Sequence, residues 1–137
     1  MERLPMIERL SLTLGRCLLG LYFLIPGLTK IPGYTDTANY MTLHEVPMVW
    51  LLLPVTIILQ VGGGLLLIAG IRIKLVALVL AGLTILINVG MHDFWNSYPG
   101  VDAGHETQNF VKNLAIFAGL LVLASTDAVN QWRLSRS

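Results

Sequence analysis

Four long apolar stretches occupy most of the chain between Leu10 and Thr126. No charged residue occurs from Val46 to Ile71, and none occurs from Leu75 to Met91. A helix that crosses a bilayer needs roughly 20 mostly apolar residues. The pattern therefore predicts four spanning helices, near residues 10–29, 47–70, 73–91 and 107–127.

Polar residues and chain breakers separate these stretches. The first connection, from about Lys30 to Val46, contains Pro32-Gly33. The second is the short turn Gly70-Ile71-Arg72-Ile73, which makes the spans on either side an antiparallel hairpin. The third, from His92 to Glu106, is polar and contains Pro99-Gly100. We predict an all-α integral membrane four-helix bundle with antiparallel up-down topology, as a single transmembrane domain over residues 1–137.

The composition agrees with a bilayer location. Hydrophobic residues make up 55% of the chain and charged residues only 12%, whereas soluble domains carry about 25% charged residues. The lipid bilayer is therefore the expected partner. A net charge of +1 without a basic patch argues against nucleic acid as a partner. Cys17 is the single cysteine, so the chain has neither a Cys-x-x-Cys redox pair nor an intrachain disulfide.

The distribution of cationic residues predicts the orientation. Four spans place both termini and the Arg72 turn on one side of the membrane. Most of the Lys and Arg residues fall on that side: Arg3, Arg9, Arg72, Lys74, Arg133 and Arg136. The other side has Lys30 and Lys112. Because Lys and Arg are in excess in cytoplasmic segments, both termini are predicted to be cytoplasmic. The histidines then lie at the outer face: His44, His92 and His105.

Two polar side chains lie well inside the apolar stretches, where burial in hydrocarbon costs a few kcal/mol. Arg16 either snorkels to the inner headgroups or has a functional role. Gln60, near the middle of the second span, is expected to make an interhelical hydrogen bond, and it could accept one from Arg16. Gly20 and Gly27 share the face of Arg16, so another helix or a flat ligand could approach closely there.

The third and fourth spans bring polar groups together near their outer ends. Asn88 and His92 lie on one face of the third span, and Lys112 and Asn113 lie at similar depth on the antiparallel fourth span. With the positive end of the helix dipole, they would form an electrophilic wall for a carbonyl or anionic oxygen, as on a quinone headgroup or a small acid. The alternative is interfacial solvation and helix-to-helix hydrogen bonding. The candidate ligand-binding residues are Arg16, Gln60, Asn88, His92, Lys112 and Asn113.

The third connection also carries groups that can bind metals. His92, Asp93, His105 and Glu106 supply nitrogen and oxygen ligands, but their spacing matches no ordinary zinc signature. We therefore expect a solvated loop and no metal site here.

Several short motifs follow one another in a recognisable order. They are Arg16-x3-Gly20-x2-Phe23-x3-Gly27-x2-Lys30, Gly62-Gly63-Gly64 followed by Gly70 and Arg72, His92-Asp93-Phe94-Trp95, and Phe110-Val111-Lys112-Asn113-Leu114. In this order the motifs resemble the DoxX family of small four-helix bacterial membrane proteins. The resemblance extends from about Leu10 to Ala124 and implies a multi-pass protein of the bacterial inner membrane.

The resemblance also implies a link to redox chemistry. The family takes its name from a subunit linked to thiosulfate:quinone oxidoreduction, and other relatives are associated with redox and thiol-stress enzymes or with quinone and catechol exposure. Relatives commonly carry Glu just ahead of the glycine cluster, where this chain has Gln60. An amide forms hydrogen bonds but does not titrate, so Gln60 argues against a proton-coupled mechanism at this position.

Three functions fit these observations. The first is a small membrane subunit or accessory factor of a quinone-linked oxidoreductase, which receives electrons from a partner because the chain has no cofactor motif and no paired thiols. The second is a non-enzymatic scaffold that docks redox enzymes at the membrane. The third is a carrier for a small molecule. A quinone is the candidate ligand, no covalently bound cofactor is expected, and the candidate protein partners are other membrane or redox subunits or a second copy of the chain.

Overall fold

The computed structural model describes residues 5–126, and within that range it contains only helices. Their bounds are α1 (Met6–Thr29), α2 (Tyr34–Leu43), α3 (Val49–Ala69), α4 (Ile73–Met91) and α5 (Ala103–Ser125). By length and composition, α1, α3, α4 and α5 are each able to cross a membrane. The predicted all-α fold with four spans is therefore confirmed. The predicted end of the last span at residue 127, and Arg3, Arg133 and Arg136, lie outside the described residues.

Helix ends differ from the prediction where polar residues extend an apolar span. α1 begins at Met6 rather than near residue 10. α5 begins at Ala103 rather than near residue 107, because the Asp102 carboxylate accepts a hydrogen bond from the backbone N–H of Gly104 at 2.9 Å. Such a cap satisfies one of the free donors at a helix start. A search for apolar residues alone does not detect these first polar turns.

Helix α2 was not predicted, because half of its ten residues are polar and it follows the breakers Pro32-Gly33. Asp36 lies in the first turn of α2, where its negative charge interacts favourably with the positive end of the helix dipole. Beyond α2, Glu45 and Met48 adopt positive φ angles of 59° and 53°, which turn the chain into α3. The connection between the first two spans is thus a helix followed by a tight turn.

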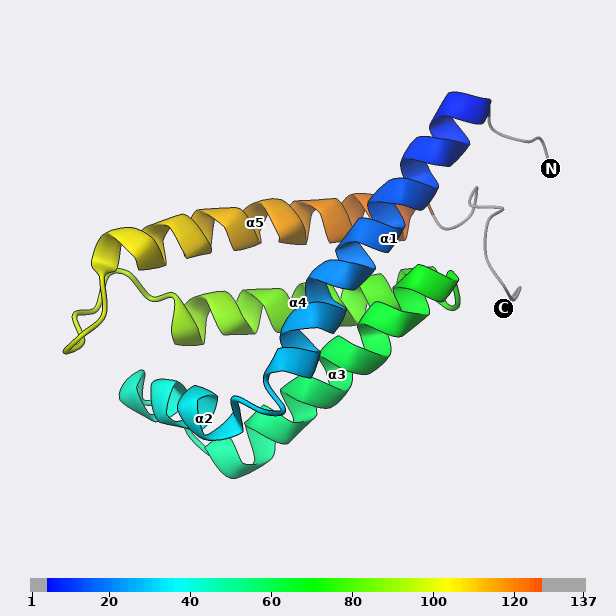
Figure 1. The fold of residues 1–137 in the computed structure, drawn as a ribbon. Helices are drawn as coiled ribbons and strands as arrows, with labels where there is room; N and C mark the ends of the chain where they lie inside the picture. The colour runs from blue at the N-terminus through cyan, green and yellow to red at the C-terminus, as the bar shows by residue number, and fades with distance from the viewer. Residues whose placement is uncertain (1–4, 127–137) are drawn as a thin grey trace.

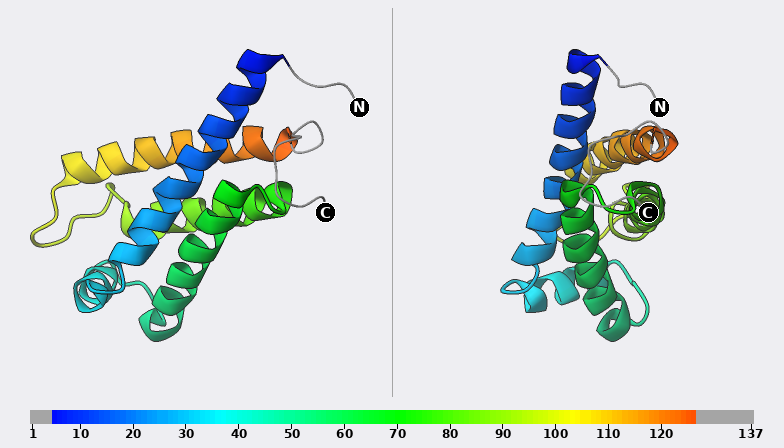
Figure 2. Two further views of the ribbon diagram at one scale, coloured as in Figure 1. Left: turned by 45° about the vertical axis from the view of Figure 1, so that its right-hand side comes forward. Right: turned by 90° about the vertical axis from the view of Figure 1, so that its right-hand side faces the viewer.

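The four spans form two antiparallel pairs, α1 with α3 and α4 with α5, which cross one another (Figure 1). The right-hand view of Figure 2 looks nearly along α4 and α5, and the two pairs appear there as two layers. α3 and α4 diverge from the turn that joins them, and α2 lies at the open end (Figure 1). The up-down order of the spans agrees with the prediction.

α4 is the most buried of the spans. Its residues Ile73, Ala77 and Leu80 are fully buried and belong to one apolar cluster with Leu67 of α3 and Leu120 of α5. The opposite faces of the spans expose aliphatic side chains: Leu18, Ile58, Leu86 and Val122. This is the arrangement expected of a bundle that faces lipid, because lipid tails are as apolar as these side chains.

Glycines allow α1 and α3 to pack with their backbones in close contact. A Cβ added at Gly20 would lie 2.7 Å from the carbonyl oxygen of Gly64, and a Cβ added at Gly64 would lie 2.6 Å from that of Gly20. A Cβ at Gly27 would lie 2.9 Å from Cβ of Gln60. The expected close approach on the face of Arg16 is therefore made by a helix.

We expect the substitution Gly20→Val to destabilise the bundle, because the added side chain would force the two backbones apart. Overpacking of this kind costs about 1–3 kcal/mol. Thermal unfolding in a mild detergent should give a clearly lower midpoint for the variant than for the wild type. Gly15→Val is the matched control, because Gly15 lies on the same helix and a Cβ there would meet nothing within 4 Å. Equal destabilisation by both variants would show that helix propensity, and not the contact with Gly64, causes the effect.

Candidate functional site

A cavity of about 380 Å³ lies between the helices. Pockets for small ligands are typically about 300–1,000 Å³ and mostly apolar, with a few polar groups that orient the ligand. Aromatic and aliphatic side chains form much of the wall, including Phe23 of α1, Leu53 of α3 and Ile87 of α4. The polar residues that line it are Tyr22, Lys30, Thr37, Thr56, Gln60, Thr84, His92, Asn109, Lys112 and Asn113. The cavity thus has the mixed lining of a small-molecule site.

Four of the six candidate residues from the sequence line this cavity. They are Gln60, His92, Lys112 and Asn113. They come from α3, from the C-terminal end of α4 and from α5, so the antiparallel arrangement does bring them to one place. Arg16 and Asn88 are not part of the wall.

Arg16, near the middle of α1, instead bonds the C-terminal end of α3. Its Nη2 donates a hydrogen bond of 3.5 Å to the carbonyl oxygen of Ile68, in the last turn of α3. A cation at this position also interacts favourably with the negative end of the α3 dipole. The anticipated hydrogen bond from Arg16 to Gln60 is absent, because Oε1 of Gln60 accepts no hydrogen bond from any described residue. We conclude that Arg16 is buried within the protein and stabilises the α1–α3 contact.

Asn88 joins α4 to α5. Its side chain is 1% exposed, and its Nδ2 donates a hydrogen bond of 3.0 Å to the carbonyl oxygen of Phe110. This is the helix-to-helix alternative that the sequence left open. A buried amide that bonds a backbone carbonyl fixes the register of the two helices.

Asn113 is held by a tyrosine that the sequence analysis did not single out. The hydroxyl of Tyr22, on α1, donates a hydrogen bond of 2.7 Å to Oδ1 of Asn113. The bond orients the amide with Oδ1 toward Tyr22, and Nδ2 of Asn113 is a donor. In the sequence, Tyr22 is notable only as a hydroxyl group within an apolar span. That position does not identify its hydrogen-bond partner.

Gln60 provides a buried acceptor. The residue is 5% exposed, and its Oε1 has no hydrogen-bond partner among the described residues. Leaving a buried acceptor unsatisfied costs about 1–3 kcal/mol. Because Oε1 has almost no accessible surface, a hydroxyl or N–H group of a bound molecule would reach it and remove that cost only after a local movement of the cavity wall.

The charged groups of the cavity wall are cationic. Lys30 and Lys112 line the cavity, and no Asp or Glu is among the residues of its wall. Burial lowers the pKa of Lys30 from its ordinary value. Burial also lowers the pKa of His92, although Glu106 acts in the opposite direction. The wall therefore favours a carbonyl oxygen or an anion over a cationic ligand.

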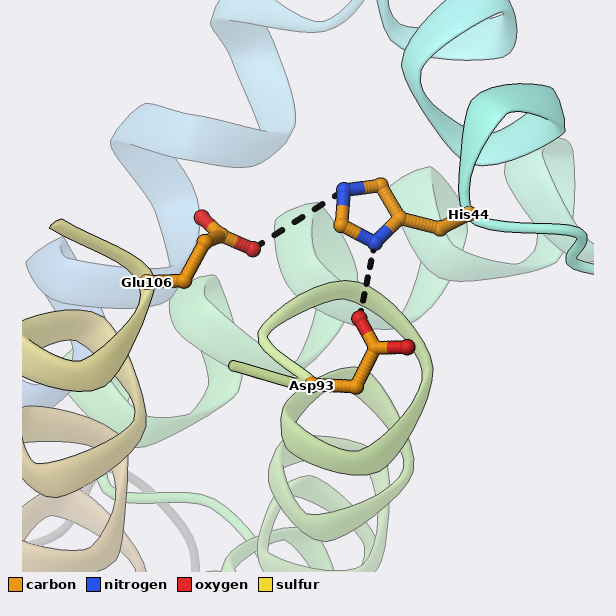
Figure 3. A group of neighbouring side chains, drawn as sticks. All are labelled: His44, Asp93 and Glu106. Atoms are coloured by element: carbon orange, nitrogen blue, oxygen red, sulfur yellow. Dashed lines mark hydrogen bonds and ion pairs between the residues drawn. The ribbon is translucent and has the colours of Figure 1, made fainter. Parts of the chain in front are cut away.

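A second polar group, the outer cluster, consists of His44, Asp93 and Glu106 (Figure 3). His44 follows α2, Asp93 follows α4, and Glu106 lies in the first turn of α5. Nδ1 of His44 lies 2.8 Å from Oδ1 of Asp93, and its Nε2 lies 3.8 Å from Oε2 of Glu106. Nδ1 of His92 lies 3.4 Å from Oε1 of Glu106. Since His92 also lines the cavity, the outer cluster adjoins the cavity wall.

Further residues hold the carboxylates of the outer cluster. Oδ2 of Asp93 accepts hydrogen bonds from Asn96, at 2.9 Å, and from the hydroxyl of Tyr98. Burial tends to raise the pKa of Asp93, but the hydrogen bonds outweigh it and hold that pKa below its ordinary value. The hydroxyl of Tyr40 donates a bond of 2.9 Å to Oε1 of Glu106. Burial, together with Glu106, raises the pKa of Tyr40 well above its ordinary value.

The expectation of a solvated loop is wrong for this group. Asp93 and Glu106 are buried, with exposed fractions of 5% and 3%. His105 is exposed and does not join them. His44 takes part instead. Its role could not be predicted from the sequence, because the segment that contains His44 was expected to be only a connection between two spans.

Two relatives match most of the chain. Inner membrane protein YqjF of Escherichia coli (strain K12) is 36% identical over 120 residues, which cover 88% of this chain and 86% of the relative. Inner membrane protein YphA of the same strain is 29% identical over 115 residues, which cover 84% of this chain and 81% of the relative. The four apolar helices agree with the location in these names. No solved structure matches the chain.

The family comparison covers nearly all of the first four helices. It includes His44 and Asp93 of the outer cluster but not Glu106. The family model described as DoxX matches residues 11–93, which is more than half of the chain. Together with the relative that is 36% identical, this match establishes the relationship that the motifs around Arg16, Gly62-Gly63-Gly64 and His92 suggested. The chain belongs to the DoxX family of multi-pass membrane proteins.

Proposed function

We propose that this protein is a small membrane subunit or accessory factor of a quinone-linked oxidoreductase, and that its cavity binds a quinone-like small molecule. The observation that carries the proposal is the cavity itself, which combines an unsatisfied acceptor on Gln60 with donors on Lys112 and Asn113. The protein lies in the bacterial inner membrane. In the orientation that the Lys and Arg residues predict, with the termini in the cytoplasm, the cavity faces the outer half of the bilayer.

The size of the cavity supports a small ring as the ligand. At about 380 Å³ it is near the lower end of the range for small-molecule pockets. Phe23 and the aliphatic wall residues supply the apolar surface against which a ring would pack. A long isoprenoid tail, if present, would extend into the lipid.

The polar groups suit both redox forms of such a ligand. Lys112 and Nδ2 of Asn113 donate hydrogen bonds to a carbonyl or phenolate oxygen, and Oε1 of Gln60 accepts one from a hydroxyl. A quinone has only acceptors, whereas its reduced form has hydroxyl donors. A wall with groups of both kinds can therefore hold the ring before and after reduction.

The electrons come from a partner protein in this proposal. Cys17 is the single cysteine, and the sequence has no motif for a redox cofactor. The chain would bind and orient the quinone, and a partner subunit would supply the electron donor. Binding by the isolated chain and activity with a partner are thus separate measurements.

We expect the purified protein to bind duroquinone, a single-ring quinone, saturably and at one site per chain. Gln60→Leu should weaken binding of the reduced form, and Lys112→Met should weaken binding of the oxidised form. Gln60 is buried, so the loss of its hydrogen bond should raise the Kd by roughly fivefold to a hundredfold. Lys112 is exposed, so the loss of its hydrogen bond should raise the Kd by only about two- to fivefold. Quenching of intrinsic fluorescence or isothermal titration calorimetry in detergent would measure the Kd.

Two matched variants serve as controls. Gln108→Leu and Lys74→Met make the same chemical changes at exposed positions outside the cavity wall, and both should keep the wild-type Kd. Absence of saturable duroquinone binding by the wild type would refute the cavity as a quinone site. Full binding with no partner enzyme in a pull-down would instead favour the carrier alternative.

Tyr22→Phe should have a smaller effect on binding. The change removes the hydrogen bond to Oδ1 of Asn113 and so frees the amide to rotate, which should raise the Kd for duroquinone a few-fold and lower the free energy of unfolding by about 1 kcal/mol. Titration calorimetry and thermal unfolding of the same sample would measure both. A Kd and an unfolding midpoint equal to those of the wild type would show that Tyr22 does not position Asn113.

A further inference from the structure

The outer cluster contains two buried polar atoms that face each other without a hydrogen bond. They are Nε2 of His44 and Oε2 of Glu106, which lie 3.8 Å apart (Figure 3). The side chains are 0% and 4% exposed, and neither atom has a hydrogen-bond partner among the described residues. Buried polar atoms almost always have a partner, so this pair calls for a third group between them.

The bond to Asp93 indicates what that group is. Nδ1 of His44 lies 2.8 Å from Oδ1 of Asp93, so the Nδ1 proton points at that carboxylate. In a neutral imidazole, the lone pair of Nε2 then points at the carboxylate of Glu106. The lone pair and the carboxylate repel each other unless a positive charge lies between them. A shared proton would draw the two atoms to about 2.7–2.9 Å. The observed separation of 3.8 Å is too long for such a hydrogen bond.

We propose that His44 and Glu106 bind a divalent transition-metal ion of the zinc type, and that the ring of His92 turns toward this pair to become the third ligand. In the present structure the side chains close enough to share an ion are His44, Asp93 and Glu106. Two donors on a tetrahedral ion with bonds of about 2.0–2.2 Å lie about 3.3–3.5 Å apart, so the pair needs to close by only a few tenths of an ångström. Nδ1 of His92 lies 3.4 Å from Oε1 of Glu106, on the same carboxylate. Two histidines and one glutamate form a known zinc ligand set that leaves a coordination position open.

The surroundings supply the second layer that such sites use. A histidine that binds a metal usually donates its other N–H to a carboxylate, which fixes the ring. Asp93 has this role for His44, and Asn96 holds Asp93 in turn. Tyr40 holds Oε1 of Glu106 and leaves Oε2 for the ion.

The ion would lie beside the cavity, because His92 belongs to both groups. Its open position would be available to water or to an oxygen of a bound molecule. The metal site itself does not depend on the quinone proposal, since all of its ligands belong to the protein.

Metal binding is measured on the full-length protein in detergent, with an affinity tag that contains no histidine. After removal of metals with a chelator, the protein is titrated with Zn²⁺ by calorimetry, and the bound metal is counted by mass spectrometry after dialysis. We expect one Zn²⁺ per chain. His44→Ala and Glu106→Gln should abolish stoichiometric binding, and Asp93→Asn should weaken it about 10- to 100-fold. Co²⁺ should give visible absorption bands that are lost in Glu106→Gln.

His105→Ala is the matched control, because His105 is exposed on the turn of α5 that carries Glu106. This variant should bind Zn²⁺ as the wild type does. If His44→Ala does not fold, the nearly isosteric Glu106→Gln carries the test, and metal-free unfolding curves show that it is folded. No stoichiometric Zn²⁺ in the wild type, or equal Zn²⁺ in the wild type and Glu106→Gln, would overturn the proposal.

Discussion

The close contact between α1 and α3 determines the shape of the rest of the bundle. Gly20 and Gly64 bring the two backbones so near that a single added carbon would meet a carbonyl oxygen. Such contacts stabilise membrane helices through packing, because lipid offers no hydrophobic driving force between them. Gly27 extends the contact to Gln60. The pair therefore acts as one layer, which presents both Gln60 and Tyr22 to the cavity.

The bundle satisfies most of its buried polar side chains by joining helices. Asn88 bonds a backbone carbonyl of α5, Tyr22 bonds Asn113, and Arg16 bonds a carbonyl at the end of α3. In hydrocarbon, each of these groups would be costly without its partner. Some buried atoms have no hydrogen-bond partner among the described residues, including Oγ1 of Thr13 and Oδ1 of Asn88. The unsatisfied atoms of Gln60 and of the His44–Glu106 pair differ from these because they belong to the cavity wall and to the outer cluster. Both proposals rest on these exceptions.

The cavity and the outer cluster meet at His92, which lines the first and approaches Glu106 of the second. A ligand in the cavity and an ion in the cluster would therefore affect one another through a single side chain. The relatives YqjF and YphA are named for their location in the inner membrane. The two proposed sites would add a chemical role to that location. α2 closes the arrangement, because it carries Tyr40 and leads directly into His44.

The sequence was sufficient to predict the spans, because the thickness of the bilayer sets the length of an apolar helix. It also placed Lys112 and Asn113 at the depth of His92, since antiparallel helices of known length fix depth. It could not determine how each helix is rotated about its axis. That rotation, set by packing, turned Asn88 toward a backbone carbonyl and Arg16 toward Ile68. Only the tertiary structure brought in His44, because the course of a polar connection depends on the surfaces against which it packs.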